Sequence, residues 1–211
     1  ISGVSGGSFT AAYYGLFGDR IFEDFDQKFL KKNVQGGLTR RLLLRPDNWV
    51  RLFSPFFQRS DLAAEYYDKI LFEKKTFRDM EARKGQSPMV HINATDMVTG
   101  IRVAFHQDAF DILCSDLSSY PVARAVTASS AVPVVLTPIT LRNYSNDCGF
   151  TLPKEIERIR REHDISSRSF HQVSNVDVYQ DVAKHKYIHL VDGGVSDNLG
   201  LRAALDRILA L

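Results

Sequence analysis

The sequence predicts an α/β fold, with helices packed on a central sheet. Segments with the alternating pattern of strands occur in turn with segments of helical periodicity, an order that favours three layers. With 211 residues, of which 44% are hydrophobic and 25% charged, the chain can bury the core of one domain. No internal repeat, low-complexity segment or change of composition marks a second domain. We therefore expect one domain over residues 1–211.

The first third of the chain is predicted to be helical. Small residues followed by apolar ones, or apolar residues at helical spacing, predict helices over residues 6–17, 21–30 and 62–72. Gly36 and Gly37 are expected to stop the second of these helices. Ser60 and Asp61 can cap the third.

The rest of the chain alternates between strands and helices. The expected strands are residues 88–95, 100–105 and 187–191, and the expected helices are residues 119–131, 154–164 and 198–211. The turn over residues 96–99 makes the first two strands a hairpin or neighbours in the sheet. Pro121 and Pro153 suit the first turns of their helices. The apolar run 132–136 is expected to be extended.

Five residues at the start of the chain, Gly3-Val4-Ser5-Gly6-Gly7, match the G-x-S-x-G pattern of a nucleophile turn. In such a turn the serine has a strained backbone between a strand and a helix, so flanking positions must be nearly free of side chains. Gly3, Gly6 and Gly7 meet that need. A plain glycine-rich turn is the alternative, but the small and then apolar residues after Ser5 favour a nucleophile.

A second candidate is the turn Asp192-Gly193-Gly194, which places a carboxylate directly after the strand 187–191. The carboxyl ends of strands are where α/β sheets collect their active sites. The alternative is a turn in which Asp192 bonds only its own backbone. Pairing with Ser5 weakens that alternative, and it predicts that the first and last strands lie side by side.

With these residues in view, the chain resembles the patatin-like phospholipases. The motifs that carry the resemblance are Gly3-Val4-Ser5-Gly6-Gly7, Ala128-Ser129-Ser130-Ala131-Val132-Pro133 and Asp192-Gly193-Gly194, in that order. The resemblance spans essentially the entire chain and implies a three-layer α/β/α fold with a mostly parallel central sheet. It also implies a catalytic dyad, with Ser5 as nucleophile and Asp192 as general base, in a lipid acyl hydrolase of the phospholipase A or lysophospholipase type.

One element of that family is missing from the sequence. In patatin-like enzymes a glycine-rich oxyanion loop precedes the serine turn, and here only Ile1 and Ser2 stand before Gly3. We therefore expect residues 1–211 to be a patatin-like catalytic domain truncated at its N-terminus. By itself this segment is expected to be inactive or badly impaired.

The chemistry of such a dyad places demands on its surroundings. An aspartate is a poorer proton acceptor for serine than a histidine, so the carboxylate must be held close to the hydroxyl and partly removed from water. The oxyanion needs hydrogen-bond donors, of which the backbone N–H of Gly6 is one. Acyl transfer to Ser5, and hydrolysis of the acyl-enzyme with water activated by Asp192, require no metal and no cofactor.

A histidine-based triad, a metal site and two other functions are the alternatives to a hydrolase with this dyad. A Ser-Asp-His triad is disfavoured, because the last histidine, His189, precedes Asp192 on a predicted strand. His185 and His189 have the spacing of metal ligands on a helix, but they lie at the start of a strand. An acyltransferase that uses the same dyad, and a catalytically silent interaction domain, are the alternative functions.

Composition limits the partners. A net charge of +2 argues against nucleic acid, and no apolar run is long enough to span a bilayer. We expect a lipid or membrane-surface substrate reached by peripheral contact. Cys114 and Cys148 lack C-x-x-C spacing, so the sequence decides neither a disulfide nor a zinc site.

Two further segments have two possible interpretations each, and two sequence motifs are assigned no role. The aromatic stretch 49–57 could shape an acyl pocket or touch a bilayer, or it could be ordinary core packing. The charged helix 154–164 could be a lid, but a solvated helix is favoured. Asn93-Ala94-Thr95 and Asn143-Tyr144-Ser145 match glycosylation sequons and are assigned no role.

Overall fold

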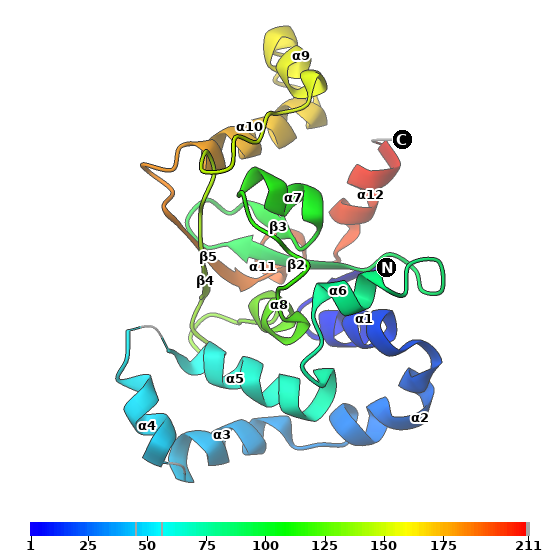
Figure 1. The fold of residues 1–211 in the computed structure, drawn as a ribbon, viewed down its shortest axis with the longest axis vertical. Helices are drawn as coiled ribbons and strands as arrows, with labels where there is room; N and C mark the ends of the chain where they lie inside the picture. Colours follow the sequence, from blue (N-terminus) through cyan, green and yellow to red (C-terminus); the bar gives the residue numbers. More distant parts are fainter. Residues whose placement is uncertain (45, 56, 210–211) are drawn as a thin grey trace.

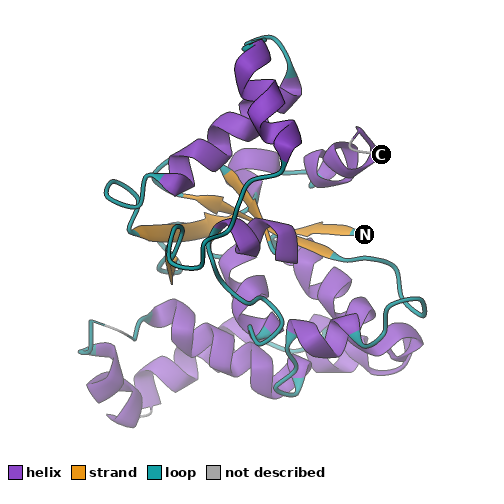
Figure 2. Ribbon diagram, turned by 45° about the horizontal axis from the view of Figure 1, so that its top comes forward, coloured by secondary structure: helices purple, strands orange, loops and turns teal. Residues whose placement is uncertain are grey.

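The computed structural model describes residues 1–44, 46–55 and 57–209. A sheet of five strands lies in the middle of the molecule with helices on both sides (Figure 1, Figure 2), so the predicted α/β fold is confirmed. The strands are β1 (Ser2–Val4), β2 (His91–Asp96), β3 (Arg102–Ala104), β4 (Ile139–Arg142) and β5 (Tyr187–Asp192).

Strand β2 organises the sheet, because it is hydrogen-bonded along both edges. The N–H groups of His91 and Met97 donate to β1 and β5, respectively. Ile92 and Asp96, at even-numbered positions, bond the segment of β3 instead. Successive residues of a strand direct their peptide groups to opposite edges. It follows that β1 and β5 share one edge of β2 and that β3 has the other.

On the shared edge, β1 and β5 meet end to end. β1 is parallel to β2 and finishes with Val4 opposite Asn93, whereas β5 is antiparallel and finishes with Asp192 opposite Ala94. The sequence predicted that the first and last strands lie side by side, and this prediction is wrong. Their carboxyl ends point at each other, which brings Ser5 close to Asp192.

The expected mostly parallel sheet is not what the described strands form. Only β1 and β2 are parallel, while the pairs β2–β3, β2–β5 and β4–β5 are antiparallel. β2 and β3 are joined by a short turn, which can connect only antiparallel strands. β5 has to run against β2 in order to meet the end of β1.

In Figure 1, helices α1, α5, α6 and α8 lie in the lower half of the view and α7, α9, α10 and α12 in the upper half, although Phe110 of α7 belongs to the same core as α8. The bounds of the first group are α1 Gly6–Phe17, α5 Arg59–Tyr67, α6 Phe77–Glu81 and α8 Val122–Ser129. The second group comprises α7 Gln107–Ile112, α9 Lys154–Glu162, α10 Arg168–Gln180 and α12 Leu201–Leu209, and α11 (Gly194–Asp197) follows β5 directly.

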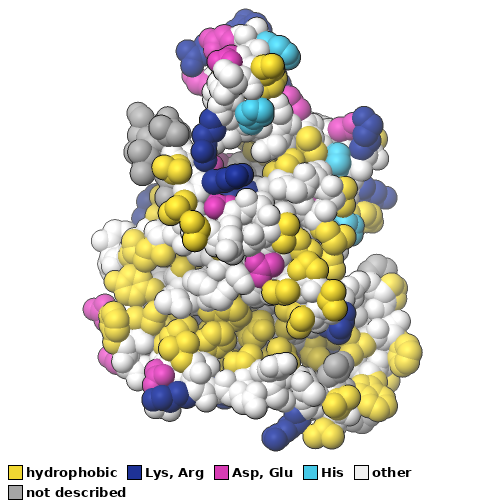
Figure 3. Space-filling model, turned by 180° about the vertical axis from the view of Figure 1, so that it is seen from behind, with side chains coloured by type: hydrophobic (Ala, Val, Ile, Leu, Met, Phe, Trp, Pro, Cys, Tyr) yellow, Lys and Arg dark blue, Asp and Glu magenta, His cyan; other side chains and the backbone are white. Residues whose placement is uncertain are grey.

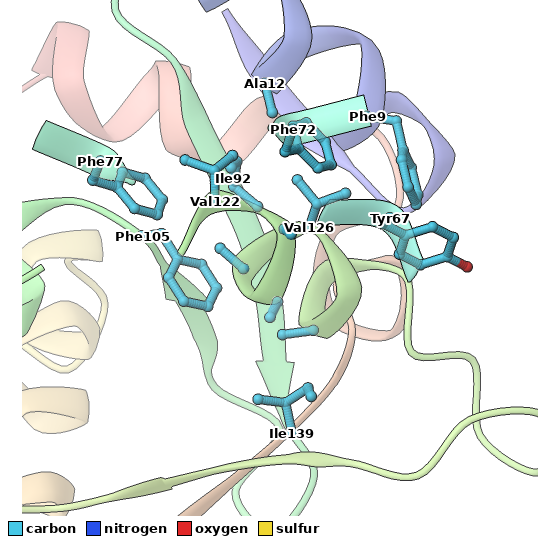
Figure 4. Packing of buried hydrophobic residues seen from close by; sticks show 14 of the residues in the cluster. Phe9, Ala12, Tyr67, Phe72, Phe77, Ile92, Phe105, Val122, Val126 and Ile139 are labelled. Carbon is cyan, nitrogen blue, oxygen red and sulfur yellow. The ribbon is translucent and has the colours of Figure 1, made fainter. Parts of the chain in front are cut away.

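The main core lies where α1, α5 and α8 meet the sheet (Figure 4). α8 supplies small and β-branched side chains, among them the fully buried Val122 and Val126, which allow close packing on β2. Phe72, in the π-helical turn Asp68–Phe72 that continues α5, is also fully buried. Burial of these apolar side chains holds α8, and the motif that follows it, against the sheet.

Residues 18–44 form more helix than predicted. A 3₁₀ turn (Gly18–Arg20) leads into α2 (Ile21–Phe25), a π-helical turn (Asp26–Leu30) and α3 (Val34–Leu44). Gly36 and Gly37 do not stop a helix, because they lie inside α3. A Cβ on Gly37 would be 2.2 Å from the Tyr66 hydroxyl oxygen, so this glycine permits close packing of α3 on α5.

Most other predicted elements are confirmed, with two differences. The hairpin of β2 and β3 and the helices α1, α5, α8, α9 and α12 occur where expected, with residues 210–211 of the last one outside the described range. Residues 132–136 form a turn, in which Val134 has a φ of 78°. Helix α5 is capped by Gln58, whose N–H donates to Asp61 at 2.9 Å.

Cys114 and Cys148 form a disulfide, with their Cα atoms 5.6 Å apart. The bond ties the end of α7 to the loop after β4, two segments 34 residues apart in the sequence. The sequence had left this pairing open. A cross-link over such a separation stabilises the fold mainly by limiting the unfolded chain.

We predict that Cys114→Ser lowers the free energy of unfolding by about 3–4 kcal/mol, as expected for a closed loop of this length. Denaturant unfolding of the full-length protein without reductant measures the change. Dithiothreitol should bring the unaltered protein down to the same stability and leave the variant unaffected. A variant as stable as the unaltered protein would contradict the prediction.

Candidate active site

Ser5 lies at the point where β1 turns into α1. Its backbone has φ 50° and ψ −128°, a conformation that L residues rarely adopt. Gly3 allows the tight turn, since a Cβ there would be 2.8 Å from the Cα of Ser8. The Ser8 hydroxyl donates to the Ser5 carbonyl at 2.5 Å and fixes the first turn of the helix. The turn therefore presents the Ser5 side chain at the carboxyl end of β1.

Asp192 lies at the carboxyl end of β5 and is only 7% exposed. The Ser5 hydroxyl donates to Asp192 Oδ2 at 2.7 Å, although the two residues are 187 positions apart. The other carboxylate oxygen, Oδ1, accepts the N–H of Gly194 at 2.7 Å. Both oxygens thus have fixed donors, and one of these donors is the Ser5 hydroxyl.

Position 193 has no room for a side chain, because the turn after β5 lies against β2. Its N–H donates to the Ser129 carbonyl at 3.0 Å, and a Cβ at this position would be 2.2 Å from the carbonyl oxygen of Asn93. No side chain can be accommodated so close to a backbone oxygen. Glycine is therefore required here by the contact of the turn with β2.

Ser129 connects the two sides of the site. The N–H groups of Ser5 and Gly193 both donate to its carbonyl oxygen, at 3.1 and 3.0 Å. Its hydroxyl also accepts from the Ser5 N–H, at 3.1 Å, and donates to the carbonyl of Asn93 at 2.6 Å. The N–H of Asp192 donates to Ala131. The motif Ala128–Pro133 therefore holds the Ser5 and Asp192 turns through its backbone and the Ser129 hydroxyl.

The steric need expected for glycine at positions 6 and 7 is not found. A Cβ at either position would meet nothing within 4 Å, so these glycines are not required by packing within the described part of the chain. Both are exposed at the N-terminus of α1. In the described residues neither N–H has a hydrogen-bond acceptor, as is usual for the first turn of a helix. Two exposed backbone donors therefore stand at the start of α1, directly after Ser5 in the sequence.

The family comparison agrees with this geometry. The family model for patatin-like phospholipases matches residues 1–205, which include the serine turn, the Ser129 segment and the Asp192 turn. The chain belongs to the patatin-like phospholipase family. Searches of the curated proteins and of the solved structures give no match. Members of this family act on lipids, so the chain is related to lipid hydrolases.

Two residues of this patatin-like site were not singled out from the sequence. Asn93, fully buried in β2, donates through Nδ2 to the Ser2 hydroxyl and to the Gly3 carbonyl, at 2.9 and 3.1 Å. Arg102 on β3 donates to Asn93 Oδ1 at 3.0 Å and pairs with Asp206. The sequon at Asn93 thus marks a structural amide. An asparagine in the middle of a predicted strand was the available signal.

The side chain of His189 and two surface hollows lie outside the contacts described above. The side chain of His189 pairs with the Thr140 hydroxyl across β4 and β5, at 3.0 Å. Two shallow hollows of about 480 and 560 Å³ are lined by residues of α3 and by residues near the end of α5, respectively. The Ser5–Asp192 contact, in contrast, joins two of the motifs that the family model covers.

The surrounding surface bears on a lipid substrate. In the described part of the chain, no helix combines the length and the apolar character needed to cross a bilayer. Trp49, Val50 and Phe53 are exposed, so core packing is the wrong interpretation for these three residues. Phe56 lies outside the described residues. The charged α9 has no buried residue and pairs with α10 through Arg160 and Asp177.

We predict that Ser129→Ala lowers the free energy of unfolding by about 1–3 kcal/mol, because the Asn93 carbonyl loses a buried donor. Denaturant unfolding of the full-length protein measures the change. Ser130→Ala is the matched control, since in the described part of the chain the Ser130 hydroxyl bonds carbonyls of α8, at Val126 and Thr127. Equal losses for the two variants would show that Ser129 has no special place.

Proposed function

We propose that the protein is a lipid acyl hydrolase that uses Ser5 as nucleophile and Asp192 as general base. The observation that carries this proposal is the 2.7 Å hydrogen bond from the Ser5 hydroxyl to Asp192 Oδ2. A nucleophile within hydrogen-bond reach of a base, with the base held by a third group, is the arrangement that covalent catalysis needs. The third group here is the N–H of Gly194.

The reaction proceeds in two steps. Ser5 Oγ attacks the carbonyl carbon of a lipid ester while its proton passes to Asp192 Oδ2. The tetrahedral intermediate then collapses, the alkoxide leaving group takes that proton, and an acyl-enzyme remains on Ser5. In the second step Asp192 takes a proton from water, the hydroxide attacks the acyl carbonyl, and the proton returns to Ser5 Oγ as the fatty acid leaves.

The surroundings of Asp192 hold its carboxylate in a fixed position. At 7% exposure the group is largely removed from water, and the donor from Gly194 fixes its orientation. The distance to Ser5 is therefore set before the substrate arrives. Such positioning lowers the entropic part of the barrier.

The N-terminus of α1 is suited to the developing oxyanion. We assign the Gly6 N–H as one donor, and the Gly7 N–H lies in the next position of the same turn. The positive end of the helix dipole points toward negative charge at this place. With no Cβ at either residue, an ester carbonyl can approach the two donors closely.

We predict that Ser5→Ala abolishes labelling of the full-length protein by a fluorophosphonate, and that Asp192→Asn slows labelling about 10³–10⁴-fold. The alanine removes the attacking oxygen, and the asparagine cannot accept the proton. Labelling is followed by gel fluorescence with time. Ser130→Ala and Asp96→Asn are the matched controls, because both residues lie close in the fold and neither bonds the dyad.

Labelling that survives in Ser5→Ala would overturn the nucleophile assignment. Equal slowing by Asp192→Asn and Asp96→Asn would overturn the base assignment. Product analysis with a defined phospholipid then separates hydrolysis, which releases a free fatty acid, from transfer to another acceptor. Protein that labels at Ser5 but releases no fatty acid without an added acceptor would favour the acyltransferase.

A further inference from the structure

Apolar side chains are concentrated on a projecting arm, which we define as α3 and α4 (Pro46–Leu52) with Phe53. The arm forms one corner of the molecule, at the lower left in Figure 1. Phe53 is 88% exposed and Val50 74%, and the exposed apolar residues of the arm are Leu43, Leu44, Trp49, Val50 and Phe53. Exposure of several large apolar side chains so close together is unusual for a surface that stays in water.

The sequence around the arm is strongly basic. Residues 31–59 contain seven lysines and arginines and one acidic residue, a net charge of +6. The whole chain carries only +2, so the remaining residues carry −4. This asymmetry is hidden in the total. A basic segment with interleaved apolar residues complements a surface that is both anionic and able to take up apolar groups.

Charged and apolar side chains are adjacent on the arm. Arg40, Leu43 and Leu44 line the same hollow of about 480 Å³ on α3. Arg59 is exposed just beyond the arm, whereas Arg51 is engaged with Glu65 and lies over the Phe57 ring. Arg40 and Arg59 are therefore the arginines whose described surroundings best suit contact with phosphate groups.

Helix α5, which follows the arm in the sequence, is hydrogen-bonded to the segment after the Ser129 motif. Ser60, at the start of α5, donates its N–H to the Thr137 hydroxyl at 3.2 Å, and its own hydroxyl donates to the Thr137 carbonyl. Thr137 follows a turn in which Val134 is 90% exposed, and Ala131, which accepts the N–H of Asp192, precedes that turn. Figure 3 shows hydrophobic side chains spread over the middle and lower part of the opposite face.

We propose that the α3–α4 arm docks on the surface of a bilayer that contains anionic phospholipids. Phe53, Val50 and Trp49 enter the boundary between headgroups and acyl chains, and Arg40 and Arg59 contact lipid phosphates. Binding of this kind is a property of the surface, so it does not depend on the catalytic proposal for Ser5. A nucleic-acid site would account for the arginines but not for the exposed apolar side chains.

The test is flotation of the full-length Ser5→Ala protein with phospholipid vesicles, so that no lipid is consumed. We predict binding to vesicles of equal parts phosphatidylcholine and phosphatidylserine, and little binding to phosphatidylcholine alone. Phe53→Asp should weaken binding at least about tenfold. Phe22→Asp on α2 is the matched control, because Phe22 is 84% exposed and lies outside the arm.

The charge contribution is tested in the same assay. Arg40→Gln combined with Arg59→Gln should weaken binding about tenfold or more, while Arg158→Gln with Arg161→Gln on α9 should leave it unchanged. Equal losses for Phe53→Asp and Phe22→Asp, or binding that ignores vesicle charge, would overturn the proposal. A Phe53-dependent dimer without vesicle binding would assign the arm to a second copy of the chain, and retention by nucleic acid alone would also overturn the proposal.

Discussion

The site depends on the hydrogen bond that the Asn93 carbonyl, on one edge of β2, accepts from Ser129. β1 and β5 approach that edge from opposite directions; β1 ends opposite Asn93 and β5 opposite Ala94, and Gly193 after β5 meets the Asn93 carbonyl. A buried carbonyl with no donor would destabilise the sheet there. The Ser129 hydroxyl donates to this carbonyl. The Ser129 carbonyl accepts the N–H groups of Ser5 and Gly193, the first residues after the two strands. The contact that completes the sheet therefore also holds the Ser5 turn against the Asp192 turn.

The glycines of the two motifs divide into two kinds for the same reason. Gly3 and Gly193 are required by packing, because a Cβ would collide with Ser8 or with the Asn93 carbonyl. Gly6 and Gly7 have open space around them, which leaves their N–H groups accessible. On our proposal, that access serves the substrate carbonyl. The G-x-S-x-G pattern thus contains one glycine required by packing, Gly3, and two whose N–H groups are left accessible, Gly6 and Gly7.

How far the sequence predicted the structure depends on the range of the interaction. The turns at Ser5 and Asp192 impose local demands on the backbone, so the residue pattern shows them. The direction of β5, the role of Asn93 and the true function of Gly37, which makes room for Tyr66, rest on contacts between distant segments. A pattern within one segment carries no signal for such contacts. The whole-chain charge likewise concealed the basic arm, because an acidic remainder nearly cancels it.

The shallow position of the candidate site can be understood together with the arm. Ser5 lies at a helix start whose neighbouring glycines are exposed, and a phospholipid ester lies just below the headgroups, close to the bilayer surface. An enzyme with a deep pocket would have to extract the whole lipid and expose its chains to water, which is unfavourable. If docking presents the turn after Ala131 to the same boundary that Phe53 enters, the ester needs to move only a short way to Ser5. On these two proposals, the apolar arm and the exposed start of α1 serve the same insoluble substrate.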